Sequence, residues 1–326
     1  MSAEFDLIRR CFTRPTRHTD LGIGDDGALI TPPPGQQLVV STDLLVEGTH
    51  FFPDTDPESL GWKTLAVNVS DIAAMGAVPR WATLGTVLPA PTLDWLDAFS
   101  RGFFACASEF GIDLIGGDTT RGSIRTFSVT ILGEVPTGRA LRRDGAQVGD
   151  SIWVSGTPGR AALGLAHLQG RTTLLEPQLS QALAALHRPQ PRVELGLALR
   201  ELPANIVTAA IDVSDGLLAD LGHILEQSGR SARLQIASLP DASLERACLL
   251  AGGDDYELVF TATPSATSVI NALGQKLTLP LTCIGTVTAA DTLNPVGSLK
   301  LYDTAGSLIP LSTLGRLGYD HFQHHG

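Results

Sequence analysis

The chain has little of what marks secreted, membrane-spanning or zinc-binding proteins. Its four cysteines are widely scattered and include no C-x-x-C pair, which argues against a zinc site and against a disulfide framework. No apolar run approaches the roughly 18 residues needed to cross a bilayer. The N-terminus also lacks the basic and apolar regions of a secretory signal. We therefore expect a cytoplasmic protein that makes no membrane contact.

Positive charge is also scarce, with 23 Lys and Arg against 34 Asp and Glu and a net charge of −11. Duplex binding needs a basic face, so we expect no nucleic-acid partner. An acidic protein that binds polyphosphate must neutralise it with metal ions, a few arginines or helix N-termini. With 43% hydrophobic and 17% charged residues among 326, the chain is typical of a globular protein long enough for two domains.

The common nucleotide-binding and hydrolase motifs are absent. There is no Walker loop, no protein-kinase H-R-D or D-F-G, no H-E-x-x-H and no G-x-S-x-G. The segment 22–27 matches the letters of G-x-G-x-x-G, but three prolines at 32–34 prevent a long helix from following it. Asp25 and Asp26 would also face a bound pyrophosphate with negative charge. We therefore reject the dinucleotide-binding interpretation.

What the chain does contain is a recurring aspartate beside glycine, serine or threonine. These positions are Gly24-Asp25-Asp26, Ser41-Thr42-Asp43, Ser70-Asp71, Gly116-Gly117-Asp118, Ser214-Asp215-Gly216 and Gly252-Gly253-Asp254-Asp255. Two carboxylates 4 Å apart repel by about 4 kcal/mol at a protein-like dielectric, so cations must lie between them. Magnesium takes one or two carboxylates and completes its shell with waters and phosphate oxygens. The pattern predicts a carboxylate cup for Mg–polyphosphate and phosphoryl transfer by alignment and charge neutralisation.

The alternation of strand-like and helix-like segments predicts an α/β (α+β) protein of two domains. Strands are expected over 37–41, 81–88, 113–115, 127–135, 151–155, 207–212, 233–237, 256–261 and 281–286. Helices are expected over 4–13, 57–75, 93–110, 160–169, 179–187, 192–202, 217–227, 242–250 and 264–273. Asp43 and Asp118 are expected just beyond strand ends, where open α/β sheets bind ligands. The glycine- and charge-rich segment 138–150 predicts a boundary between domains 1–140 and 141–326.

The helix expected over 57–75 has Asp56 as its N-cap and Pro57 at its first position. Apolar residues at i, i+4 and i+7 form one stripe, and Thr64, Asn68 and Asp71 form a neighbouring face. Because the surrounding residues are apolar, we expect both faces to be buried, with a solvated polar face as the alternative. A buried carboxylate without a partner costs several kcal/mol, so Asp71 should be hydrogen-bonded or metal-bound.

Eight short segments of the chain together form a recognisable set: Gly-Ile-Gly-Asp-Asp (22–26), Ser-Thr-Asp (41–43), Gly-Thr-His-Phe (48–51), Asn-Val-Ser-Asp-Ile-Ala-Ala-Met-Gly-Ala (68–77), Gly-Gly-Asp-Thr-Thr (116–120), Asp-Val-Ser-Asp-Gly-Leu (212–217), Gly-Gly-Asp-Asp-Tyr-Glu-Leu (252–258) and Gly-Tyr-Asp-His-Phe (318–322). In combination and order, they resemble thiamine-monophosphate kinase from about residue 4 to residue 322. Some of them are shared with aminoimidazole ribonucleotide synthetase and selenophosphate synthetase.

The resemblance implies ATP- and Mg²⁺-dependent phosphorylation of thiamine monophosphate to thiamine diphosphate, in line and without a phosphoenzyme. It also implies a homodimer whose N-terminal mixed sheets pair into a barrel, each followed by a C-terminal α/β sandwich. The metal residues it implies are Asp26, Ser41, Thr42, Asp43, Asp71, Asp118, Asp212 and Asp215. The implied ATP residues are Gly117, Asp118, Arg143 and Ser214. The implied thiamine monophosphate residues are His50, Asp254 and Tyr319, although many relatives have Glu where this chain has Asp254.

Several of these residues also have simpler explanations. Asp25 could cap its loop while Asp26 binds metal, and His50 could be an ordinary surface histidine. Arg143 could be a solvated linker charge, although a triphosphate needs a cation in so acidic a protein. Tyr319 could pack on the core, or it could offer its ring to the thiazolium cation.

Other functions stay open at this point. The chain could be a sensor that binds Mg–nucleotide without chemistry, a sister enzyme of the same fold, or a metal-dependent phosphohydrolase. His50, Asp254 and Tyr319 argue against a sensor, because a sensor needs no groups for a second substrate. Cys11 lies outside any glycine-rich loop, which argues against a selenophosphate synthetase.

Overall fold

The computed structural model of the chain describes residues 9–236, 243–314, 316–319 and 322. The chain divides into two compact units, here called unit 1 (Met1–Ala73 with Ala77–Ala140) and unit 2 (Ala74–Gly76 with Leu141–Gly326). The change of unit at Ala140 falls within segment 138–150. Of the helix expected over 4–13, residues 9–11 are helical and residues 4–8 lie outside the described part. No helix in the described part is both long and apolar enough to cross a membrane.

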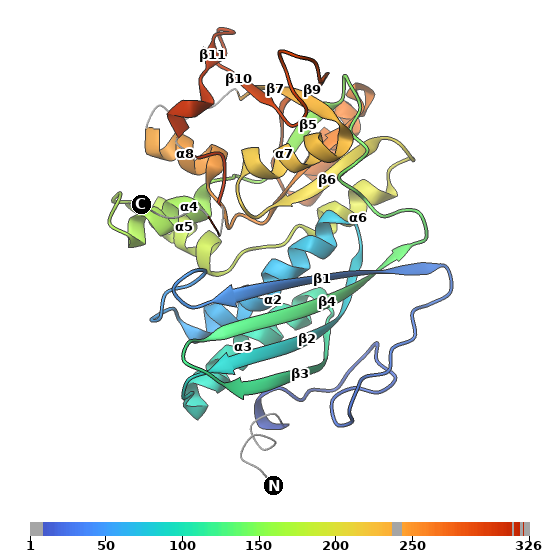
Figure 1. Cartoon of the computed structure of the whole chain (residues 1–326). Coiled ribbons are helices and arrows are strands. Elements are labelled where there is room, and N and C mark those ends of the chain that lie inside the picture. The colour runs from blue at the N-terminus through green and yellow to red at the C-terminus, as the bar shows by residue number, and fades with distance from the viewer. Residues whose placement is uncertain (1–8, 237–242, 315, 320–321, 323–326) are drawn as a thin grey trace. The chain divides into compact units, whose positions relative to one another are not determined.

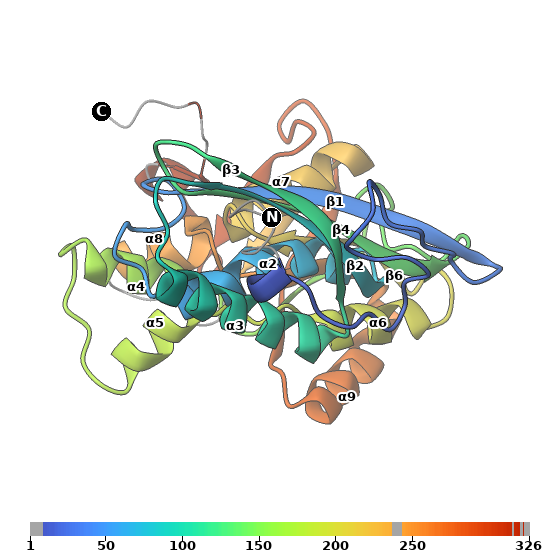
Figure 2. The same cartoon turned by 90° about the horizontal axis from the view of Figure 1, so that it is seen from below.

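Unit 1 is a four-stranded mixed sheet in the order β1-β4-β2-β3, as Figure 1 shows. Its elements are β1 (Gln36–Val46), α2 (Pro57–Ala74), β2 (Val78–Leu88), α3 (Leu93–Phe110), β3 (Asp113–Arg121) and β4 (Thr126–Pro136). Strands β2 and β3 are parallel, and the other pairs are antiparallel. Figure 2 shows α2 and α3 on one face of the sheet, where β4 buries alternate side chains such as Phe127 and Ile131.

The two helices of unit 1 pack with their backbones very close together, which requires glycine at the points of contact. A Cβ at Gly102 of α3 would overlap the carbonyl oxygen of Glu58, and a Cβ at Gly61 of α2 would overlap that of Phe99. The caps of α3 follow from its sequence. Thr92 accepts a hydrogen bond from the Trp95 amide at 3.2 Å, and Gly111 ends the helix at φ 68°.

Unit 2 is a seven-stranded sheet in the order β11-β10-β7-β9-β5-β8-β6. Its strands are β5 (Ser151–Ser155), β6 (Val207–Val213), β7 (Arg230–Gln235), β8 (Glu257–Ala262), β9 (Leu281–Ala289), β10 (Leu299–Tyr302) and β11 (Leu308–Ile309). Its helices are α4 (Arg160–Leu168), α5 (Gln178–His187), α6 (Val193–Glu201), α7 (Leu217–Ser228), α8 (Ser243–Ala251), η1 (Pro264–Ala266), α9 (Thr267–Leu277) and η2 (Leu311–Leu314). Only β7 and β10 pair in parallel among these strands.

Two apolar cores lie on opposite faces of this sheet because side chains alternate along each strand. Ile152 and Val154 pack in one core with residues of α7 and α8. Trp153, between them in sequence, packs in the other core with residues of α6 and α9. The two-domain α/β fold with a mixed N-terminal sheet is therefore confirmed.

The positions of Asp43 and Asp118 differ from the prediction. Both lie inside strands, because β1 continues to Val46 and β3 continues to Arg121. Residues 41–43 are all polar, so their sequence does not show that side chains alternate between the two faces of the strand, with Leu45 buried on one of them. In β3, Gly117 lies so close to β2 that a Cβ at this position would overlap the Leu84 carbonyl oxygen. The two glycines therefore allow β3 to pair closely with β2, and the strand continues through them.

Substitution Gly102→Ala should lower the free energy of unfolding by about 3 kcal/mol, because the added methyl forces α2 and α3 apart. Gly222→Ala is the matched control, since Gly222 also lies within a helix and a Cβ there meets nothing within 4 Å. It should raise stability by up to about 1 kcal/mol. Urea unfolding of both variants tests this, and equal stability of the two would contradict the close helix contact.

Candidate functional site

In unit 1, a first acidic group lies where β1 crosses α2. The Ser41 hydroxyl donates a hydrogen bond to Asp71 Oδ2 at 2.5 Å, and the Asp43 amide donates to Asn68 Oδ1 at 3.0 Å. Asn68 is held in turn, because its Nδ2 donates to the Thr64 carbonyl at 3.1 Å. Thr64 and Asn68 are both buried. The expectation of a hydrogen-bonded Asp71 is therefore confirmed. The polar face is buried at Thr64 and Asn68 and partly buried at Asp71, so a fully solvated face is wrong.

Thr42 differs from its neighbours because its hydroxyl lies on the other face of β1. It is within 2.8 Å of the Thr130 hydroxyl on β4. Alternation along a strand sends Ser41 and Asp43 to one face and Thr42 to the other. The structure therefore does not bring the Thr42 hydroxyl to the carboxylate of Asp71.

A second acidic group lines a cavity of about 940 Å³ in unit 1. Its lining includes Asp26 from the glycine-rich loop and Gly117 and Asp118 from β3. Asp25 Oδ1 accepts a hydrogen bond from the Asp26 amide at 2.9 Å, as expected of a loop cap. The cavity also has an apolar part and further polar residues that the sequence did not indicate, namely Arg9, Phe12, Thr83, Leu84, Thr86, Leu114 and Ile115.

The loop that contains Asp26 is tied to the start of β3. The buried Asp113 accepts hydrogen bonds from the amides of Arg17 (2.9 Å) and His18 (2.7 Å) and from the hydroxyl of Thr19 (2.8 Å). Carboxylates that accept amide hydrogen bonds are held firmly. Asp113 therefore fixes the chain a few residues before the glycine-rich loop.

The width of the sheet separates the two acidic groups of unit 1. Strands β1 and β3 are its opposite edges, with β4 and β2 between them. Three spacings of about 4.8 Å put these edges roughly 14 Å apart. Asp43 and Asp118 therefore do not share one metal ion within a single copy of unit 1.

His50 lies between β1 and α2. Its Nδ1 accepts a hydrogen bond from the Val46 amide at 3.0 Å, which requires Nδ1 to be the unprotonated ring nitrogen. This hydrogen bond sets the orientation of the imidazole ring.

In unit 2, the predicted residues gather where β6 meets α7. Buried Asp212 is the second-last residue of β6, and Ser214 and Asp215 lie in the connection to α7. The Ser214 carbonyl accepts a hydrogen bond from the Asp254 amide at 2.8 Å, and the Asp215 carbonyl accepts one from the Tyr319 amide at 2.9 Å. Backbone contacts alone thus bring together residues from three distant segments.

Asp220 shapes this connection, although the sequence did not single it out. Its Oδ2 accepts hydrogen bonds from the amides of Ser214, Asp215 and Gly216 at 3.0–3.1 Å. Burial raises the pKa of Asp220 to about 6, Asp215 adds to the rise, and the amide hydrogen bonds oppose it. An acidic residue in the first turn of a predicted helix is the sequence feature that could have indicated it.

The structure places Arg143 away from this connection. Its carbonyl oxygen accepts a hydrogen bond from the Ser228 hydroxyl at 3.0 Å, at the last residue of α7. The neighbouring Arg142 carbonyl accepts from the Ala210 amide at 2.9 Å, so this segment runs beside β6. Ser214 precedes the other end of α7, about 18 Å from Ser228 at 1.5 Å per residue.

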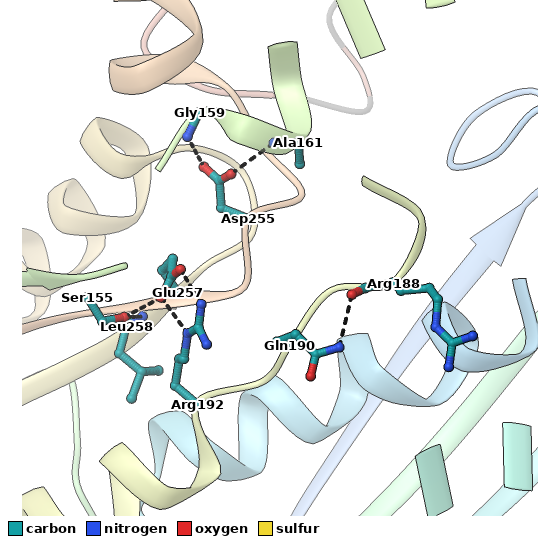
Figure 3. A network of polar contacts seen from close by, with 9 residues as sticks. All are labelled: Ser155, Gly159, Ala161, Arg188, Gln190, Arg192, Asp255, Glu257 and Leu258. Atoms are coloured by element: carbon teal, nitrogen blue, oxygen red, sulfur yellow. Dashed lines mark hydrogen bonds and ion pairs between the residues drawn. The ribbon is translucent and has the colours of Figure 1, made fainter. Parts of the chain in front are cut away.

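Figure 3 shows a polar network around Asp255 and Glu257 that the sequence did not indicate. Asp255 accepts hydrogen bonds from the amides of Gly159 (2.6 Å) and Ala161 (3.3 Å) at the start of α4. Glu257 accepts two hydrogen bonds of 2.6 Å from the Arg192 guanidinium and one of 2.5 Å from the Ser155 hydroxyl. The network fixes the chain on either side of Tyr256.

The carboxylate and hydroxyl oxygens of these groups suit magnesium better than a metal ion whose ligands must all come from the protein. Among the described residues, no group of three or more His, Cys, Asp or Glu side chains is arranged to hold a metal ion. Magnesium is bound through one or two carboxylates together with waters and phosphate oxygens. Asp71, supported by Ser41 and with Asp43 two residues further along the same strand face, meets that smaller requirement.

Comparison with known proteins agrees with this two-domain fold and identifies the chain as an AIR synthase related protein. The model of the N-terminal domain of that family matches residues 24–135, and the model of its C-terminal domain matches residues 147–297. Within this class, the chain belongs to the thiamine-monophosphate kinase family.

Three relatives illustrate the match. A thiamine-monophosphate kinase of Salmonella typhimurium is 44% identical over an alignment of 332 positions, gaps included, that covers 98% of each chain. The crystal structure of the enzyme from Stenotrophomonas maltophilia is 45% identical with a TM-score of 0.79, covering 94% of this chain and 96% of that one. A structure described as AaThiL complexed with AMPPCP and TMP is 27% identical with a TM-score of 0.72, covering 98% of this chain and 96% of that one.

The pKa of Asp255 gives a testable pH dependence. Burial raises it to about 8, Glu257 and Asp254 add to the rise, and the amides of Gly159 and Ala161 oppose it. The folded state then keeps a proton that the unfolded state loses near pH 4, so this group lowers the free energy of unfolding as pH rises from about 4 to 8.

The variant Asp255→Asn lacks this titration. The stability of the native protein relative to this variant should therefore fall between pH 5 and pH 8, measured by urea unfolding in EDTA. A difference that stays constant over that range would show that Asp255 is ionised throughout and held by the amides of α4.

Proposed function

We propose that this protein transfers the γ-phosphoryl group of ATP to thiamine monophosphate, giving ADP and thiamine diphosphate for thiamine diphosphate biosynthesis in the cytoplasm. A phosphate oxygen of thiamine monophosphate attacks the γ-phosphorus in line, and the bond to the β–γ bridging oxygen breaks. The pairing of Ser41 with Asp71 carries the proposal most directly, because it holds a magnesium-type carboxylate in place. The names of the relatives and the AMPPCP- and TMP-bound structure support it.

Magnesium ions fit the acidic groups and would be held by Asp26, Ser41, Asp43, Asp71, Asp118, Asp212 and Asp215. Thr42, which the resemblance also implies, is left out because its hydroxyl faces Thr130 on the other side of β1. When bound, it supplies charge neutralisation for the phosphates of ATP and for the transferring group. The protein contributes fixed geometry. Ser41 orients the Asp71 carboxylate, Asn68 holds the Asp43 backbone, and the Asp220 carboxylate holds the amides of Ser214 and Asp215.

The cavity of unit 1 suits the nucleotide. Its volume is within the range of about 300–1,000 Å³ that is typical of small-molecule sites. Leu84, Leu114 and Ile115 offer apolar surface to a base, and Gly117 lets the backbone approach a phosphate closely. Asp118 shares the cavity, while Ser214 and Arg143 are the proposed nucleotide contacts of unit 2.

The cationic thiazolium ring of thiamine monophosphate suits the groups around Asp254. We assign thiamine monophosphate to His50, Asp254 and Tyr319, because a carboxylate and an aromatic face attract a thiazolium ring. In unit 2, Asp254 and Tyr319 are joined through the Ser214 and Asp215 carbonyls. The carboxylate of Asp254 replaces the longer glutamate implied by the resemblance, and Tyr256 contacts it.

A homodimer accounts for two features of unit 1. Leu38, Val40 and Leu44 on the outer face of β1 are 39%, 59% and 51% exposed. A second copy that pairs its sheet with this one into a barrel would bury this apolar face. If the β1 edge of one copy adjoins the β3 edge of the other, the Asp71 group and the Asp118 group come from different copies.

The activity itself can be measured with purified protein, ATP and thiamine monophosphate. ADP and thiamine diphosphate should form in equal amounts and only when both substrates are present. Turnover should stop in EDTA and return with excess Mg²⁺. Phosphate release without an acceptor would instead favour a phosphohydrolase, and nucleotide binding without turnover would favour a sensor.

The shared site predicts complementation between inactive variants. Asp71→Asn and Asp118→Asn should each lose nearly all activity, while Asp97→Asn, a surface carboxylate paired with Arg10, should keep it. Mixing the two inactive variants with subunit exchange should restore about one quarter of native activity, because half of the dimers then hold one intact site. A mixture that stays inactive although heterodimers form would contradict a site built from two copies.

A further inference from the structure

The backbone is unusual at Asp254 and Tyr256. Asp254 has φ 70° and Tyr256 has φ 53°, and only Asn205 and Thr278 share positive φ among the described non-glycine residues. Such conformations cost about 1–3 kcal/mol each and persist only where surrounding contacts enforce them. Two of them within three residues therefore indicate a segment held in one particular shape.

Contacts on three sides enforce this shape. The amides of Asp254 and Tyr256 donate to the carbonyls of Ser214 and Val213, each at 2.8 Å. The side chain of Asp255 accepts the amides at the start of α4, as Figure 3 shows. Immediately afterwards, the Arg192 guanidinium holds Glu257 through paired hydrogen bonds at the first residue of β8.

This backbone shape brings the side chains of Asp254 and Tyr256 into contact. In a regular strand the two side chains would lie on the same face without a hydrogen bond between them. The Tyr256 hydroxyl donates a hydrogen bond of 3.0 Å to Asp254 Oδ1. Tyr256 is itself buried, with 7% of its surface exposed, so its ring has little freedom to move. The carboxylate of Asp254 is therefore oriented by a fixed donor.

We infer that Tyr256 is a positioning residue, whose hydroxyl holds the Asp254 carboxylate in the orientation that binds the thiazolium cation of thiamine monophosphate. This inference rests on the proposed function and adds a residue to it. Asp254 is a short side chain that can turn about its Cβ–Cγ bond, and a hydrogen bond to one oxygen removes that freedom. Pre-organised groups bind more tightly because less freedom is lost on binding.

The test is Tyr256→Phe, which removes only the hydroxyl and keeps the buried ring. The KM for thiamine monophosphate should rise about threefold to tenfold, the loss expected for one hydrogen bond, while the KM for ATP stays within about twofold. Tyr302→Phe is the matched control. Tyr302 lies on β10 in the same unit, where its ring faces the Arg233 guanidinium.

A double-mutant cycle separates positioning from a structural role. In an Asp254→Ala background, Tyr256→Phe should change the KM for thiamine monophosphate by less than about 1.5-fold, because its partner is gone. Equal effects in both backgrounds, or a parallel rise in the KM for ATP, would overturn the inference. Thermal unfolding of each variant shows whether a change reflects loss of fold.

The two proposals fail in different ways. Native protein that forms no thiamine diphosphate would refute the proposed function. Active native protein whose Tyr256→Phe variant has an unchanged KM for thiamine monophosphate would refute the positioning role alone.

Discussion

Repulsion between like charges is the constraint on which this structure depends. A protein with net charge −11 uses several aspartates at one kind of site, so each carboxylate must be held by fixed donors or shared with a cation. The structure shows the first means at Asp71, which accepts from Ser41, and at Asp220, which accepts from three consecutive amides. The second means is the role proposed for magnesium, which also joins carboxylates to the phosphates of a nucleotide.

The geometry of unit 1 decides how these carboxylates can be combined. A sheet in the order β1-β4-β2-β3 places the Asp43 and Asp118 strands at opposite edges. The proposed pairing of two sheets into a barrel would explain both the exposed apolar face of β1 and the separation of the two acidic groups. In unit 2, by contrast, backbone hydrogen bonds bring residues 212–215, 254 and 319 together within one chain.

The sequence predicted most elements because their periodicity and caps are strong. The helix over 93–110 lies at its predicted residues, since Thr92 and Gly111 mark both ends. The lengths of β1 and β3 were not predictable in the same way, because Ser-Thr-Asp and Gly-Gly-Asp have the composition of loops and extend as strands only through pairing with β4 and β2. The short strands β10 and β11 were missed for lack of a repeating pattern. The contacts of Tyr256 and Asp220 depend on backbone geometry, which composition does not reveal.

The most direct test of the central claim is the position of the metal. Crystals grown with Mn²⁺, AMPPCP and thiamine monophosphate would locate each metal ion by anomalous scattering. We expect metal ions coordinated by the Asp71 carboxylate of one copy and by nucleotide phosphates, with Asp118 of a second copy contributing to the same site. Metal ions bound elsewhere, or nucleotide phosphates bound away from both carboxylates, would contradict it.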